Sequence, residues 1–196
     1  MSSTIHRLLL AALAITALGG CASLPKSACQ SGAWYDIGLR DGSSGHTEDR
    51  FLDHAQACVR HGLPADRDQW MLGRARGLER YCTVRNGLAV GENNSRYGGV
   101  CPAEREDEFL RGYDVGRDLH AARGELASIE GEMQRIRARL APPDDHSDDA
   151  DEKRKDEKPL TDKERITLAY QLGMLTVQRE TARRQLGDIE LVARSF

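Results

Sequence analysis

The sequence predicts a mainly α-helical protein: a small disulfide-linked cluster of short Gly-containing helices, followed by a long antiparallel helical hairpin of the coiled-coil type. Three observations predict it: glycines spaced four apart behind aromatic residues, four cysteines beyond residue 21, and a heptad pattern in the C-terminal part. The chain has 196 residues, of which 39% are hydrophobic and 30% charged. This length suits one ordinary domain with extensions.

Residues 1–20 predict a lipoprotein signal peptide. Arg7 precedes an apolar run over residues 8–18, which is too short to span a bilayer. The motif Leu-Gly-Gly-Cys then ends at Cys21 and resembles the lipobox of bacterial lipoproteins, in which the cysteine is acylated. We expect the chain to be exported and anchored to the lipid bilayer through Cys21. The residue after Cys21 is Ala22 and not Asp. By resemblance to the sorting rules of enterobacterial lipoproteins, in which Asp at this position retains the protein at the inner membrane, we expect the periplasmic face of the outer membrane. The alternative is an ordinary secretory signal, or a buried helix, with a chance cysteine.

The next expected domain is a Cys/Gly-rich helical domain over residues 21–117. Its four remaining cysteines are Cys29, Cys58, Cys82 and Cys101. An even number in an exported chain indicates disulfides, for which three connectivities exist. We favour Cys82–Cys101, because the turn-rich segment between them can bring its ends together, and Cys29–Cys58 then follows by elimination.

Metal binding is the weak alternative for one of these cysteines. His54, Cys58 and His61 follow the helical spacing i, i+4, i+7. The chain has no CxxC pair, however, and zinc sites usually have closer ligand spacing. We therefore expect no metal and no cofactor.

An aromatic residue, a glycine three residues later and a second glycine four residues after that recur along this domain. The copies are Tyr35/Gly38/Gly42, Trp70/Gly73/Gly77, Phe109/Gly112/Gly116 and a weaker Val84/Gly87/Gly91. Two glycines four apart share one helical face and allow another backbone to approach closely. Because each glycine costs about 1 kcal/mol against alanine inside a helix, the pairs need a packing reason. The alternative is that some glycines mark turns and helix ends, as we expect for Gly42, Gly62 and Gly91.

These motifs are similar to those of a known family. The matching strings are Trp34-Tyr35-x-x-Gly38-x-x-Asp41-Gly42-x-x-Gly45, Gly73-x-x-x-Gly77-Leu78-x-x-Tyr81-Cys82-Thr83, Tyr97-x-x-Val100-Cys101-Pro102 and Tyr113-x-x-Gly116. Over about residues 29–120 the chain resembles bacterial lipoproteins that carry the domain of unknown function 2799. The resemblance implies a small cell-envelope domain and assigns no activity or site residue.

A heptad seam predicts two C-terminal helices. Its positions are Val115, Leu119, Ala122, Leu126, Ile129, Met133, Ile136 and Leu140, then Leu168, Leu172, Leu175, Arg179, Ala182, Leu186, Ile189 and Ala193. We expect a coiled-coil helix over residues 118–141 and a second helix over residues 161–196, which starts at a capping box of Thr161 and Glu164. The acidic segment 142–160 is expected to be a flexible linker. Intrachain pairing and dimerisation are both feasible, and we favour an antiparallel intrachain pair.

No catalytic motif is present, and a net charge of −3 gives no general attraction to nucleic acid. We expect His54, His61 and His120 to decorate helix faces. The function we favour is a non-enzymatic structural or protein-interaction module of the envelope, whose hairpin contacts a periplasmic protein partner. A small-ligand or metal-binding lipoprotein is the alternative, and an envelope hydrolase is the third. The candidate packing or ligand surface comprises Trp34, Tyr35, Trp70 and Tyr97.

Overall fold

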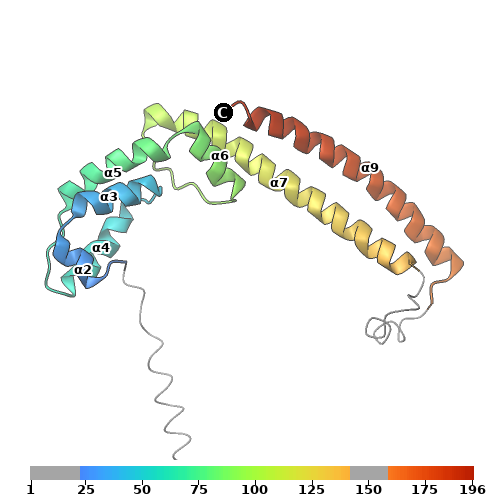
Figure 1. Cartoon of the computed structure of the whole chain (residues 1–196), viewed down its shortest axis with the longest axis horizontal. Coiled ribbons are helices and arrows are strands. Elements are labelled where there is room, and N and C mark those ends of the chain that lie inside the picture. The colour runs from blue at the N-terminus through green and yellow to red at the C-terminus, as the bar shows by residue number, and fades with distance from the viewer. Residues whose placement is uncertain (1–22, 142–158) are drawn as a thin grey trace, which may run out of the picture. The chain divides into compact units, whose positions relative to one another are not determined.

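The computed structural model describes residues 23–141 and 159–196 (Figure 1). Within these ranges the chain is helical and has no strand, as the sequence predicts. The helices are α2 (Lys26–Ser31), α3 (Trp34–Ser43), α4 (Asp49–Val59), α5 (Arg67–Tyr81), α6 (Val84–Glu92), α7 (Ala103–Leu140) and α9 (Asp162–Ala193). In the described ranges no helix is long and apolar enough to cross a membrane. The predicted signal peptide, Cys21 and most of the predicted linker lie outside the described residues.

The chain divides into two compact units. Unit 1 contains the described residues up to Cys82 together with Tyr97–Ala103, and unit 2 contains Thr83–Arg96 together with the described residues from Glu104 onward. This division differs from the single domain expected over residues 21–117. The reason lies in the glycines, because α3 pairs with α5 in unit 1, whereas α6 pairs with α7 in unit 2.

In unit 1, α3 and α5 contact each other backbone to backbone. A Cβ atom added at Gly38 would overlap the carbonyl group of Trp70, and one added at Gly73 would overlap that of Tyr35. Gly42 and Gly77 make the equivalent contacts one turn further along both helices. Since the contacts advance in the same order on both helices, the pair is parallel. The predicted packing role of these glycines is confirmed.

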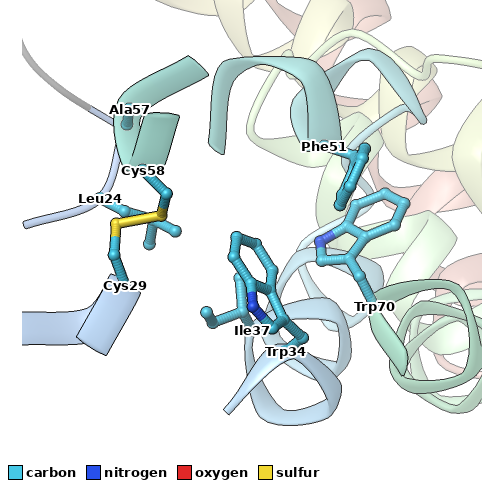
Figure 2. Close-up of a cluster of buried hydrophobic side chains, with 8 residues drawn as sticks. All are labelled: Leu24, Cys29, Trp34, Ile37, Phe51, Ala57, Cys58 and Trp70. Carbon is cyan, nitrogen blue, oxygen red and sulfur yellow. A yellow bond between two sulfur atoms is a disulfide. The ribbon is translucent and has the colours of Figure 1, made fainter. Parts of the chain in front are cut away.

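The apolar core of unit 1 lies beneath this pair (Figure 2). The buried cluster comprises Leu24, Cys29, Trp34, Ile37, Phe51, Ala57, Cys58 and Trp70. The ring of Phe51 packs against both tryptophans, with its centroid 6.0 Å from that of Trp34 and 5.4 Å from that of Trp70. The Cys29–Cys58 disulfide joins α2 to α4, so the core is covalently closed on that side.

In unit 2, α6 and α7 repeat the same parallel contact. Added Cβ atoms at Gly87 and Gly91 would overlap backbone carbonyl groups of α7, and those at Gly112 and Gly116 would overlap carbonyl groups of α6. Val84/Gly87/Gly91, the weaker match to the motif in sequence, therefore makes the same backbone contact as the three stronger matches.

Two glycines combine their expected position with a packing role. Gly42 and Gly91 lie in the last turns of α3 and α6, near helix ends as expected, and both are also buried at the helix contacts. Gly62 takes the predicted turn conformation, with φ at +70°. The spacing of four residues to the preceding glycine was the signal for the packing role of Gly42 and Gly91.

The antiparallel hairpin of α7 and α9 is confirmed (Figure 1). Met133, Ile136 and Leu175 are buried between the two helices. Arg183 pairs with Glu130 at 2.8 Å and Arg123 with Glu190 at 3.5 Å, so the partners run in opposite directions. The capping box of Thr161 and Glu164 is present at the start of α9.

One boundary is wrong by four helical turns. The first hairpin helix was expected over residues 118–141, but α7 begins at Ala103. The same continuous helix carries the Gly112/Gly116 contact and then the seam, because nothing in its sequence interrupts helical backbone between them.

Candidate functional site

A buried polar cluster lies inside unit 1. Its centre is the carboxylate of Asp41 on α3, which accepts a hydrogen bond from Trp70 Nε1 at 2.8 Å. His54 Nε2 on α4 lies 3.0 Å from the same Asp41 oxygen, and His54 Nδ1 lies 2.9 Å from the hydroxyl of Ser23. Asp41 is 7% exposed and His54 is 2% exposed. Three helices and the segment before α2 therefore meet at one hydrogen-bonded cluster.

The electrostatics of the cluster favour an ionised Asp41. Burial raises the pKa of the Asp41 carboxyl, but hydrogen bonds from His54 and Trp70 act in the opposite direction and outweigh it, so the pKa lies below its ordinary value. An ionised carboxylate only accepts hydrogen bonds, so His54 Nε2 carries a proton. His54 Nδ1 then accepts from Ser23 when the imidazole is neutral.

The order Ser23, His54, Asp41 matches the connectivity of a hydrolytic triad. A hollow of about 660 Å³ in unit 1 lies elsewhere: it is lined by Trp34, the Leu63–Pro64–Ala65 loop and the start of α5. Neither Ser23 nor His54 lines that hollow. What the geometry does establish is a connection between the N-terminal segment and three helices of unit 1.

Sequence reasoning misplaced His54, which we expected on a helix face. It lies inside unit 1 because α4 turns Phe51, His54 and Cys58 toward the core. The spacing of these three residues, i, i+3, i+7, is a core signal in which histidine takes one position. His120 is exposed on α7, as expected, whereas His61 is exposed in the turn that follows α4 and is not on a helix.

The weak metal candidate is not assembled. The sulfur of Cys58 is bonded to Cys29, and both ring nitrogens of His54 have other partners. Among the residues that the structure describes, no group of three His, Cys, Asp or Glu side chains is placed to hold a metal ion. The disulfides are Cys29–Cys58 and Cys82–Cys101, the pairing that the sequence analysis favoured.

The four aromatic candidates take separate places. Trp34 and Trp70 are core residues, 4% and 0% exposed. Tyr35 is exposed at the surface, and the hydroxyl of Tyr97 accepts the backbone N–H of Cys101 at 2.9 Å. Of the four, Trp34 alone lines the hollow described above. The four residues therefore form no common surface, and the two tryptophans have the predicted packing role.

A second candidate surface lies on the outer face of α9. We call it the outer stripe; its members are Ile166, Tyr170, Met174 and Val177. Their exposed fractions are 70%, 70%, 49% and 65%. Leu168, Leu172 and Leu175 lie on the opposite face, toward α7. The sequence analysis missed the outer stripe, although its spacing of 4, 4 and 3 residues is itself a helical pattern.

The comparisons with known proteins agree with the motif analysis. No curated protein and no solved structure matches the chain. Residues 33–118 match the model of a family described as protein of unknown function, DUF2799. The matched stretch contains all four glycine pairs and three of the four disulfide cysteines, Cys58, Cys82 and Cys101. Residues 33–118 therefore carry the domain of unknown function 2799, as the motifs indicated.

Proposed function

We propose that this chain is a cell-envelope lipoprotein that works as a protein-interaction module, and that the outer stripe of α9 is its partner-binding surface. The lipobox-like motif at Cys21 supports the anchor. Two disulfides among the described residues support an oxidising compartment, because such bonds are rare in the cytosol. The outer membrane, with the protein on its periplasmic face, is the location that this sequence pattern favours.

The outer stripe is the observation that carries the proposal. A surface helix normally has one apolar face, whereas α9 has two opposite apolar faces over residues 166–177. This segment is about 17 Å long at the helical rise per residue. Burying one large apolar side chain contributes about 1.5–3 kcal/mol, so a partner that covers all four gains several kcal/mol. We propose a protein partner that offers an apolar helix face or groove.

Photocrosslinking in intact cells tests this surface. A benzophenone amino acid replaces Tyr170 in the outer stripe or, as the matched control, the exposed Gln178 on the same helix. We expect a discrete protein adduct from position 170 that is much weaker from position 178. The double variant Ile166→Lys/Val177→Lys should lose the adduct from position 170. Equal adducts at both positions, or none at either, would contradict the assignment.

The anchor is tested separately. Cys21→Ser should release the protein from membranes or leave it unprocessed, and fractionation of cells measures this. A variant that is processed and remains with the membrane as the wild type does would show that the anchor assignment is wrong.

A hydrolase is the second candidate, favoured by the Ser23–His54–Asp41 hydrogen bonds. A fluorophosphonate probe reports it directly, because such a probe phosphonylates a serine, with loss of fluoride, only when the serine hydroxyl is activated as a nucleophile. Labelling of the full chain that disappears in Ser23→Ala would establish a nucleophile. Labelling that persists in the variant, or is absent from the wild type, would remove this candidate.

A further inference from the structure

The segment closest to Cys21 is built into the fold of unit 1. Ser23 is the first residue that the structure describes, and its hydroxyl lies 2.9 Å from His54 Nδ1. Leu24 is 7% exposed and belongs to the core cluster, where Figure 2 shows it beside the Cys29–Cys58 disulfide. Two consecutive residues are therefore fixed before α2 begins.

The groups that contact Ser23 and Leu24 are fixed by further hydrogen bonds and by a disulfide. His54 Nε2 is tied to Asp41, and Asp41 to Trp70. The disulfide that Leu24 contacts joins α2 to α4. Displacing Ser23 and Leu24 would expose an apolar side chain and leave His54 Nδ1 without its partner inside the unit. The segment is thus part of the folded body of unit 1.

The covalent distance from this body to the predicted anchor is very short. One residue, Ala22, separates Cys21 from Ser23. Two residues of even a fully extended chain span at most about 7 Å. A tether of this length is shorter than the width of one helix with its side chains, which is about 10 Å.

We infer that unit 1 rests directly on the lipid surface, with the start of α2 next to the headgroups. The inference rests on the proposed acylation of Cys21. The acyl chains hold Cys21 at the boundary of the bilayer, and the short tether then holds Ser23 within about 7 Å of it. The partner of this surface is the phospholipid headgroup layer, and unit 1 has no room to move away from it.

Lys26 and Leu72 give a matched pair of positions within unit 1. Lys26 is the first residue of α2, is exposed, and follows Ser23 by three residues. Leu72 is 60% exposed on α5. It lies on the face of α5 turned away from Gly73 and Gly77, which contact α3. Because Leu72 is apolar and exposed, it also controls for adhesion to lipid that does not depend on the tether.

The test uses the full acylated chain in vesicles of phosphatidylethanolamine and phosphatidylglycerol. A benzophenone amino acid replaces Lys26 or Leu72, and mass spectrometry measures the phospholipid adducts. We expect a several-fold higher adduct yield at position 26. A Gly/Ser spacer of about ten residues between Ala22 and Ser23, with a mean span of roughly 17 Å, should lower the yield at position 26 several-fold and leave the fold intact.

The outcomes separate the inference from the proposed function. Equal yields at the two positions, or a yield at position 26 that the spacer does not change, would overturn the inference while Cys21 remains acylated. The mass of the N-terminal peptide reports acylation independently of crosslinking. A chain that carries no acyl group on Cys21 would overturn the lipoprotein assignment and, with it, the inference.

Discussion

Gly73→Ala tests the helix contact that organises unit 1. The added Cβ would overlap the carbonyl oxygen of Tyr35, and it would lie 2.8 Å from the carbonyl carbon of Tyr35 and 2.9 Å from the backbone nitrogen of Leu39. All three atoms belong to backbone, so no side-chain rotation relieves the overlap. Ordinary van der Waals contact begins at 3.4 Å, so the carbonyl carbon alone requires α3 and α5 to separate by 0.6 Å, the difference between 3.4 and 2.8 Å. The carbonyl oxygen is closer to the added Cβ and requires a larger separation.

The expected cost combines three effects. Overpacking of a tight contact costs about 1–3 kcal/mol. Separation also weakens Cα–H···O contacts of about 0.5–1 kcal/mol each. Alanine recovers about 1 kcal/mol of helix propensity. We expect a net loss of about 2 kcal/mol in the free energy of unfolding of unit 1, or roughly 10 °C in Tm.

Urea unfolding followed by tryptophan fluorescence measures this loss, because both tryptophans of the chain, Trp34 and Trp70, lie in unit 1. Gly124→Ala is the matched control. Gly124 lies inside α7, and no atom of another described segment comes within 4 Å of an added Cβ, so alanine should stabilise that helix by up to about 1 kcal/mol. Circular dichroism at 222 nm follows the control. If Gly73→Ala is as stable as the wild type, the parallel contact is not tight and the reasoning is refuted.

Three further predictions concern other parts of the chain. The pKa of the Asp41 carboxyl lies below its ordinary 3.8, so its contribution to stability is present above that pH and is lost as the pH falls through the lowered value. Asp41→Asn should cost about 1–3 kcal/mol at pH 7 and flatten the fall in stability below about pH 4, as acid titrations of unfolding would show. Replacing Cys82 and Cys101 by serine opens a loop with a sequence separation of 19 and should cost about 3 kcal/mol, measured by thermal unfolding without reductant; an unchanged Tm would contradict this. Arg179→Leu, on the seam near Leu175, should stabilise the hairpin by about 1–2 kcal/mol in chemical denaturation, because the buried Arg179 Nε has no hydrogen-bond partner among the residues that the structure describes; a less stable variant would show that the arginine is required there.

The hairpin was predictable because its signal is local and repeated. Each seam position, such as Met133 or Leu175, stands three or four residues from the next, and Pro142 follows the first helix. The outer stripe was missed because Tyr170 and Val177 fall between seam positions. Only the structure shows that the intrachain partner covers one face and leaves the other exposed.

The glycine pairs were predictable as packing sites, but their partners were not. The spacing of Gly38 and Gly42 shows that a backbone approaches, and it contains no information about which backbone or in which direction. That choice depends on contacts between residues such as Gly38 and Trp70, which are far apart in the sequence. The hydrogen-bond partners of His54 were unpredictable for the same reason, since Ser23 and Asp41 come from other elements.

The connectivity of the disulfides has a consequence for how the protein matures. Among the four cysteines that follow Cys21, each disulfide joins neighbours in order, the first with the second and the third with the fourth. A chain that enters an oxidising compartment N-terminus first exposes both partners of the first bond before Cys82 arrives. The native bonds are then the ones that form first as the thiols become available. Oxidation in the order of synthesis therefore yields the native pairing without later thiol–disulfide exchange.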